Sequence, residues 1–279
     1  MDNNFQRSDC GTFLYHQSLE PFKWLRHGFS LRRRPNDVSD FNLGFNGNEN
    51  RDLILRNRRD FVSAVWSAGG KIPADVILVR QIHSNRVITI KAPPASPVCE
   101  EADGLVSDVP GVLLGVQTAD CMPVLIAAPQ RRAVAVVHAG WRGTAKRIAQ
   151  NVVARMKTDL HVDPADCLAV VGPCIRSCCY EVGLEVLQAF RDEMGTDIGF
   201  LPETPGGRQL APGESGASRG PLRLDLPAAC LNQLLEAGLK AERIFSDPPC
   251  TACHQELFFS HRAESGRTGR MIATIGLVA

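Results

Sequence analysis

The chain has 279 residues, of which 44% are hydrophobic and 22% are charged, as expected for a soluble globular protein. Its formal net charge of +1 disfavours a nucleic-acid partner, because binding the phosphate backbone needs a clustered excess of lysine and arginine. The N-terminal residues lack the apolar core of a signal peptide, and no run approaches the roughly 20 apolar residues of a membrane span. We therefore expect a cytoplasmic protein with no membrane partner, whose ten cysteines are thiols or metal ligands rather than a disulfide framework.

Hydrophobic spacing predicts one helix and several strands in the first half of the chain. Residues 1–30 carry scattered aromatics and one weak strand, and residues 41–47 form a turn-rich loop. Apolar positions at helical spacing predict a helix from Asn50 to Ala68, which Gly69 and Gly70 end. Short apolar runs predict buried strands at Val76–Val79, Val87–Ile90, Val112–Val116, Val124–Ala127 and Ala133–Val137.

The second half of the chain alternates predicted helices and strands. Thr144 is a candidate N-cap for the first of these helices. A glycine- and proline-rich stretch at residues 201–221 predicts a mobile loop rather than a linker between domains. The expected elements are a helix at 144–156, a strand at Leu168–Val171, helices at 180–194 and Asp225–Ala237, and a last strand near Met271–Leu277.

Three residues stand out by their positions beside the predicted strands. His83 follows the first of them, Cys121 lies in the connection between two apolar strands, and His138 ends another strand before a helix. Sites in α/β folds gather where strands end and helices begin. Two imidazoles and a thiolate suit Zn²⁺ and leave a fourth position for water or substrate, and the ion lowers the pKa of such a water towards neutrality.

Each of these residues also has a structural interpretation. A single histidine beside a strand is usually hydrogen-bonded within the fold, and a single cysteine usually packs in the core. The spacing of positions 83, 121 and 138 fits no local zinc-finger pattern. Residue types and positions alone therefore leave both interpretations open.

Several blocks of the sequence resemble the signature blocks of the laccase-domain family, also called the polyphenol oxidase or purine nucleoside phosphorylase family. Thr118–Cys121 and His138–Gly143 are highly specific when they occur together, and the resemblance extends over nearly the whole chain. The matching blocks are Arg80–His83, Ala102–Val106, Thr118–Val124, His138–Gly143, Gly172–Ile175, Cys178–Val182, Leu224–Leu226, Cys250–Thr251, Phe258–Ser260, Gly266–Arg270, and an N-terminal echo at His27–Ser30, Asn42–Gly44 and Asn57–Arg58.

The resemblance implies a zinc ion bound by His83, Cys121 and His138, which match the family's His, Cys and His ligands. It implies phosphorolysis of adenosine, inosine and methylthioadenosine with phosphate, and deamination of adenosine. For residues 1–279 it implies a single α+β domain of mixed β-sheets in layers with outer helices, similar to the fold of toxins of the cytotoxic necrotizing type. Ser84 departs from the family pattern, because many relatives have glycine there, which puts the local backbone and the substrate approach in doubt.

Three other functions remain as alternatives. Copper-dependent phenol oxidation gave the family its old name, and thiolate and imidazole do accept Cu²⁺, but one three-ligand site lacks the several copper centres of a true laccase. A cysteine hydrolase would use Cys121 as nucleophile and His138 as its base. The resemblance supports this alternative, because bacterial relatives have been linked to editing of peptidoglycan precursors. A non-enzymatic protein would use zinc to close a structural site.

Four further residues have one functional and one structural interpretation each. Asp120 either orients a ligating imidazole or caps a turn. Arg142 either binds phosphate together with a helix N-terminus or forms a structural salt bridge. Arg267 and Arg270 either serve the same anion or belong to a solvated tail.

The remaining cysteine clusters are ambiguous. We expect Cys174, Cys178 and Cys179 to pack at the entry to a helix, since the implied ligand set is complete without them. The segment Cys250–His254 matches the haem c attachment pattern, but covalent haem normally needs export. A second metal site there and a turn with buried thiols both remain open.

Overall fold

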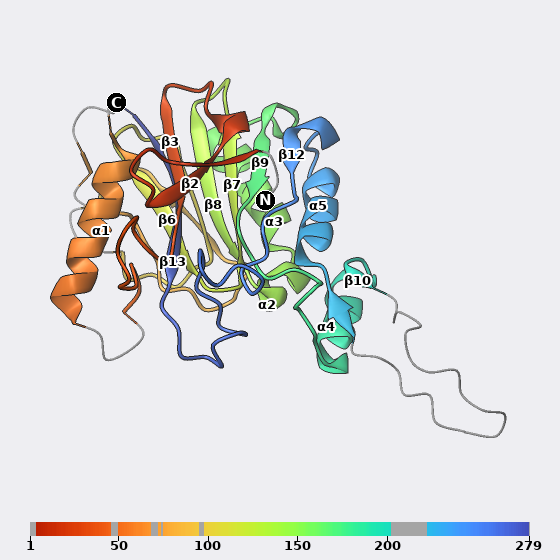
Figure 1. The fold of residues 1–279 in the computed structure, drawn as a ribbon. Helices are drawn as coiled ribbons and strands as arrows, with labels where there is room; N and C mark the ends of the chain where they lie inside the picture. The colour runs from red at the N-terminus through yellow and green to blue at the C-terminus, as the bar shows by residue number, and fades with distance from the viewer. Residues whose placement is uncertain are drawn as a thin grey trace, which may run out of the picture.

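Two large β-sheets stack face to face in the described part of the chain, and helices cover their outer faces (Figure 1). The computed structural model describes residues 4–45, 50–67, 72–73, 75–94, 98–201 and 222–278. One sheet has the order β1 (Phe5–Arg7), β2 (Phe13–His16), β3 (Leu25–Ser30), β13 (Met271–Leu277), β6 (Leu113–Thr118). The other has the order β12 (Ile244–Phe245), β9 (Leu168–Val171), β7 (Met122–Ala128), β8 (Ala133–Ala139), β5 (Gly104–Ser107), β4 (Val87–Ile90), and β10 (Phe200–Leu201) pairs separately with β11 (Arg223–Leu224).

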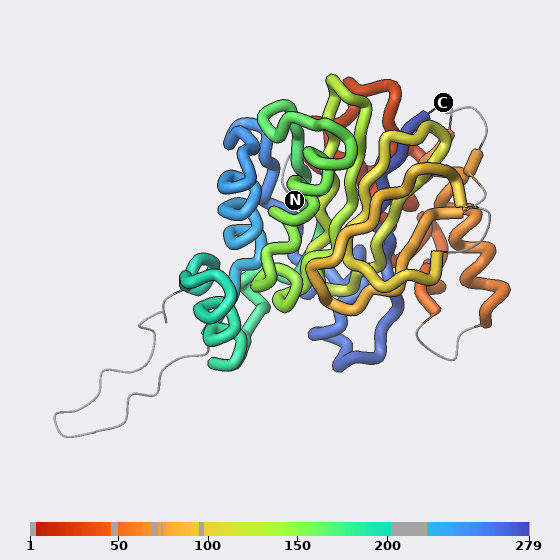
Figure 2. Tube along the Cα trace, turned by 180° about the vertical axis from the view of Figure 1, so that it is seen from behind, coloured from red at the N-terminus to blue at the C-terminus, as the bar shows by residue number. Residues whose placement is uncertain are grey.

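The helices lie on opposite outer faces of the stacked sheets (Figure 2). Helix α1 (Arg51–Val65) packs beside β3 and starts at Asn50, whose side chain accepts hydrogen bonds from two backbone N–H groups of the first turn. Helix α3 (Ile148–Leu160) packs on β8, β5 and β4. The other helices are α2 (Trp141–Ala145), α4 (Leu184–Met194), α5 (Leu226–Glu236) and the 3₁₀ turns η1 (Gln17–Leu19), η2 (Pro164–Asp166) and η3 (Ala241–Arg243). No helix within the described ranges is long and apolar enough to cross a membrane.

Strands β7 and β8 form the centre of the core because both of their faces are covered. All residues of these strands are buried. Successive side chains of a strand point to opposite faces, so Val124 and Ile126 pack under α3 while Leu125 and Ala127 pack against the five-stranded sheet. Each fully buried valine, leucine or isoleucine of these strands contributes about 1.5–3 kcal/mol.

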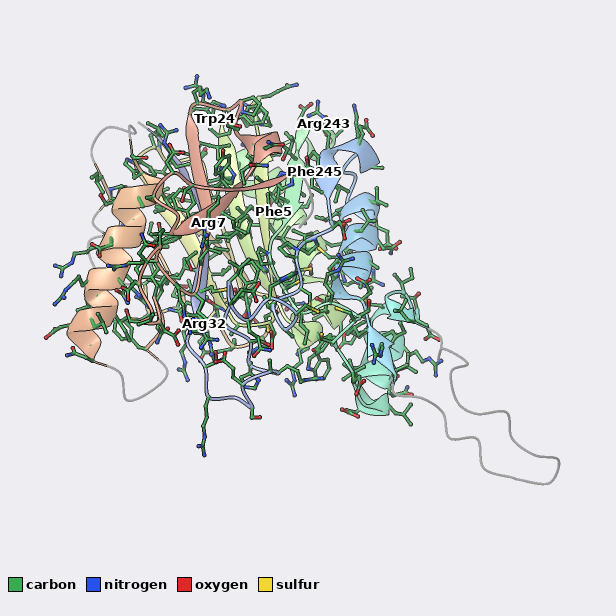
Figure 3. All side chains as sticks on the ribbon, viewed as in Figure 1. Phe5, Arg7, Trp24, Arg32, Arg243 and Phe245 are labelled. Atoms are coloured by element: carbon green, nitrogen blue, oxygen red, sulfur yellow. The ribbon has the colours of Figure 1, made fainter. Side chains whose placement is uncertain are left out.

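Ring contacts through His16 connect an edge strand of one sheet to an edge strand of the other; Figure 3 labels the two outer residues, Phe5 and Phe245. Phe5 of the edge strand β1 meets the ring of His16 at 4.9 Å, and His16 meets Phe245 of the other edge strand, β12, at 5.0 Å. Phe5 and His16 are both buried. The N-terminal strand therefore belongs to the core.

The predicted layered α+β architecture is confirmed, but the predicted strand at Val76–Val79 is wrong. Ile77 alone bridges to β6, where its N–H donates to Leu113 (2.7 Å), and Arg80 then bridges to Glu101. The segment passes from one partner to another within three residues, so no regular ladder forms. Residues 4–30 also hold three strands where one weak strand was expected.

Two predicted helices have different bounds in the structure. The helix expected at 144–156 is divided into α2 and α3 by Arg147, which has φ 62° and donates to the carbonyl of Met194 (3.1 Å). Thr144 lies inside α2 and is not its N-cap. The helix expected at 180–194 begins only at Leu184, because Glu181 pairs with Arg223. The loop expected at 201–221 lies outside the described residues except for Leu201.

Candidate functional site

The structure brings His83, Cys121 and His138 together from three chain segments. Cys121 lies where the chain passes from β6 in one sheet to β7 in the other, and His138 belongs to β8. One ligand atom from each residue lies within 4.8 Å of the others. His83 Nε2 is 3.8 Å from Cys121 Sγ, and the two imidazole rings meet edge to face at 4.9 Å.

A buried carboxylate that the sequence did not single out positions both histidines. Asp103 Oδ1 accepts hydrogen bonds from His138 Nδ1 (2.8 Å) and from the His83 N–H (3.0 Å). Its Oδ2 accepts from the Ser84 N–H (2.6 Å) and hydroxyl (2.7 Å), and from the Ile82 N–H (3.3 Å). Burial raises the pKa of Asp103, but these hydrogen bonds outweigh it and lower that pKa to about 2. One signal in the sequence could have identified this residue. Asp103 belongs to the block Ala102–Val106, which resembles the family, and it directly precedes the buried strand β5.

The contact between Cys121 and His138 favours a thiolate facing a protonated imidazole. Burial raises the pKa of Cys121, but the charge of His138 and hydrogen bonds from His138 and His83 bring it down to about 6. Burial lowers the pKa of His138, but Cys121 and Asp103 raise it to about 9. A thiolate is the form that acts both as a metal ligand and as a nucleophile.

The backbone around the three side chains adopts uncommon conformations. His83 has φ 58° and Asp120 has φ 85°, in the left-handed region that non-glycine residues seldom occupy. Gly140 is the N-cap of α2. A Cβ at Gly140 would lie 3.0 Å from Cys121 Sγ and 3.0 Å from His83 Cδ2, so any larger residue there would press both side chains aside by a few tenths of an ångström.

The donor set fits a zinc ion. With Zn–S near 2.3 Å and Zn–N near 2.0 Å, two ligands of a tetrahedral site stand about 3.5 Å apart, close to the 3.8 Å between Cys121 Sγ and His83 Nε2. Asp103 occupies Nδ1 of His138, which leaves Nε2 as the ligand atom. Three protein ligands and one vacant position are typical of a catalytic zinc site.

Asp120 does not orient an imidazole. Its Oδ1 accepts from the Thr251 hydroxyl (2.7 Å) and its Oδ2 from the Arg262 N–H (2.6 Å). The side chain therefore ties the C-terminal loop to the turn that carries Cys121. Of the two expected roles, the structural one agrees with these contacts, and the orienting role falls to Asp103.

The three side chains line a pocket of about 600 Å³ whose wall is rich in cations. Arg142 stacks over the Trp141 ring at 4.3 Å, and no carboxylate of the described residues lies within 4.0 Å of it, so the predicted salt bridge is not formed. Arg267 is exposed and does not line the pocket. The cationic and aromatic lining residues are Arg80, Arg142, His261, Arg262, Arg270, Phe45, Trp141 and Tyr180.

Cys174, Cys178 and Cys179 do not enter a helix. The segment turns back at Arg176, whose carbonyl accepts from the Cys179 N–H (2.8 Å), and α4 begins only at Leu184. Cys174 is buried, and its backbone forms an isolated β-bridge with that of Cys250; both thiols are free.

Ser84, where the sequence departs from the family pattern, is accommodated without strain. Its hydroxyl donates a hydrogen bond to Asp103, and the left-handed backbone conformation falls on His83 and not on Ser84.

A family model described as multi-copper polyphenol oxidoreductase laccase matches residues 26–278. The chain belongs to this family. The resemblance of its sequence blocks to the laccase-domain family is thereby confirmed.

Relatives of this laccase family include proteins named for nucleoside chemistry. The chain is 34% identical to purine nucleoside phosphorylase YlmD of Geobacillus stearothermophilus over 247 residues, covering 85% of this chain and 84% of that protein. It is 35% identical to adenosine deaminase RL5 of an unknown prokaryotic organism over 205 residues, covering 70% and 73%. The crystal structure of Bacillus licheniformis hypothetical protein YfiH matches with a TM-score of 0.82 at 29% identity, covering 99% of both chains.

Proposed function

We propose that this protein is a zinc-dependent enzyme of purine nucleosides. It splits adenosine, inosine and methylthioadenosine with phosphate into the free base and ribose 1-phosphate or methylthioribose 1-phosphate, and it deaminates adenosine. The observation that carries the proposal is the convergence of His83, Cys121 and His138 within 4.8 Å on the wall of a cation-lined pocket. The names of the relatives supply the substrate class.

Different residues of the pocket would hold the zinc ion, orient His138 and bind the substrates. A bound zinc ion supplies a Lewis acid and activates a nucleophile at neutral pH. Asp103 keeps a proton on Nδ1 of His138 and directs the other ring nitrogen into the pocket. Arg142 and Arg262 line the pocket as cations for phosphate, because guanidinium groups bind phosphate oxygens in a planar, bidentate manner. Tyr180 and Trp141 offer aromatic faces for a purine.

The test is product analysis with metal-replete protein. Inosine with phosphate is expected to yield hypoxanthine and ribose 1-phosphate, and adenosine is expected to yield inosine as well as adenine. Cys121→Ser is expected to abolish both reactions, whereas Cys10→Ser, at an exposed cysteine outside the pocket lining, should leave them unchanged. A protein with full zinc occupancy that converts no purine nucleoside would refute the proposal.

A cysteine hydrolase is the second candidate, favoured by the lowered pKa of Cys121 beside His138. In this case Cys121 attacks a carbonyl and His138 transfers the proton. Iodoacetamide separates the two candidates. Zinc that protects Cys121 from alkylation supports the metal enzyme, whereas rapid alkylation in zinc-containing buffer supports the nucleophile. Copper loading followed by a phenol oxidation assay tests the third possibility, which the family description raises.

A further inference from the structure

A second group of metal-ligating side chains lies outside the pocket. One sulfur atom from each of Cys178, Cys179, Cys250 and Cys253 lies within 4.8 Å of the others. Cys253 Sγ is 3.5 Å from Cys178 Sγ and 3.4 Å from Cys179 Sγ. We call these residues the four-cysteine cluster. None of them lines the pocket that holds Cys121.

The backbone holds the four-cysteine cluster in place. Cys250 and Cys253 lie on one turn, closed by the His254 N–H donating to the Cys250 carbonyl (3.2 Å). Cys178 and Cys179 lie within the turn that begins at Arg176. The two segments are joined by a backbone β-bridge between Cys174 and Cys250, in which the Thr251 N–H donates to the Cys174 carbonyl (3.0 Å). The sulfur atoms are thus brought together without any bond between them.

The chemistry of the four-cysteine cluster favours one metal. With Zn–S near 2.3 Å, the sulfurs of a tetrahedral site stand about 3.8 Å apart, close to the separations in the structure. Four thiolates in tetrahedral arrangement are typical of zinc, whereas carboxylate-preferring Mg²⁺ and Ca²⁺ need oxygen ligands. A pair of cysteines with two residues between them on one turn, as in Cys250 and Cys253, is a usual spacing of a structural zinc site. We propose that the four-cysteine cluster binds one Zn²⁺ ion in a closed, structural site.

The four cysteines are free thiols in the structure. Binding of Zn²⁺ displaces the thiol protons to solvent and leaves the sulfurs as thiolates, so no oxidant or reductant is required.

The ion would fasten two segments that build the wall of the pocket. Ile175 and Tyr180 line the pocket on either side of the turn at Arg176. Thr251, next to Cys250, holds Asp120 and with it the turn of Cys121. Zinc in the four-cysteine cluster therefore stabilises the pocket wall without contacting a substrate.

The test is done in a variant that lacks the proposed catalytic site. His83→Ala with Cys121→Ser removes two of the three ligands there, so any tightly held zinc must lie elsewhere. We expect this double variant, purified under reducing conditions, to retain about one zinc per chain by elemental analysis. Adding Cys253→Ser should lower zinc affinity at least tenfold, while adding Cys10→Ser, at an exposed cysteine outside the cluster, should leave it unchanged.

A second measurement does not depend on how the serine variants fold. Cobalt added to the double variant should give the intense sulfur-to-cobalt charge-transfer absorption of four thiolates, lost when zinc is added back. Absence of tight zinc in the double variant overturns the proposal, as does a zinc affinity that Cys253→Ser leaves unchanged. A disulfide between Cys253 and Cys178 or Cys179 that survives purification under reducing conditions also overturns it. Because the catalytic ligands are already removed, none of these outcomes depends on the proposed enzymatic activity.

Discussion

Asp103 shows how a single carboxylate can define a site without entering it. It accepts five hydrogen bonds from three consecutive residues and from His138. A carboxylate that orients a ligating imidazole fixes its tautomer and raises its basicity. The position of His83 and the direction of His138 thus depend on the same oxygen atom, Oδ1 of Asp103.

Replacing Asp103 with asparagine is expected to weaken zinc binding by about 10–100-fold. The asparagine amide has one acceptor oxygen, whereas the donors around Asp103 bond to two carboxylate oxygens. The NH₂ group of the amide would also face backbone N–H donors. Competition with a chromophoric chelator measures the affinity. Ser84→Ala is the matched control, because it removes only the hydroxyl contact to the carboxylate and should cost about 1.5–3 kcal/mol of stability. Unchanged zinc affinity in Asp103→Asn would show that other residues orient the imidazoles.

Arg142 lines the pocket and is a candidate to bind phosphate. Its guanidinium has no carboxylate partner within 4.0 Å among the described residues, so it is available to an anion. Arg142→Ala is expected to raise the KM for phosphate about tenfold while kcat with inosine changes little, since a hydrogen bond to a charged group is worth about 1.5–3 kcal/mol. Arg267→Ala, at an exposed arginine outside the pocket lining, should change neither constant. An effect on the KM for inosine alone would place the phosphate elsewhere.

Strand β3 contains a histidine whose pKa is strongly shifted. His27 Nε2 accepts from the His16 N–H (2.9 Å). Burial, and then the nearby His16 and Arg26, lower the pKa of His27 to about 3. The unfolded chain binds a proton near pH 6.5, so this contribution to stability is complete above that pH and is lost as the pH falls towards 3.

His27→Gln should therefore be less sensitive to acid than the wild type. Between pH 7 and pH 5 the wild type is expected to lose about 2 kcal/mol more stability than the variant. Urea unfolding at the two pH values measures the difference, and the slope with pH, not the absolute stability, decides it. Parallel losses in both proteins would mean that His27 is protonated in the folded state.

At the scale of elements, the sequence predicts what depends on local pattern and misses what depends on distant contacts. The strands β4, β7, β8, β9 and β13 were predicted close to their bounds, because a buried strand appears in the sequence as a run of consecutive apolar residues. The break at Arg147 was missed because nothing between Ala145 and Ile148 disfavours a helix. That break is held by Met194, nearly fifty residues away.

The same distinction applies to the candidate site. His83, Cys121 and His138 were singled out because each stands beside a predicted strand or connection, which is a local feature. Asp103 was missed because its partners are 19 to 35 residues away in the chain. The four-cysteine cluster was visible only as two separate motifs, because a break of about 70 residues separates them.

For the whole molecule, removal of metal should silence the protein without unfolding it. The two large apolar clusters lie between the sheets and under α3, and they contain none of the three proposed catalytic ligands. After chelation we expect the far-ultraviolet circular dichroism to be unchanged and the thermal transition to remain cooperative. Complete unfolding on chelation would instead support a purely structural role for zinc.

The position of β13 has a consequence for synthesis on the ribosome. This C-terminal strand lies between β3 and β6, and β6 runs directly into the turn of Cys121. Until β13 has been synthesised, β6 lacks this strand as a sheet partner, so the turn that carries Cys121 can be fixed in place only late in synthesis. A chain that stops before Met271 would therefore lack the sheet partner of the strand that leads into this turn.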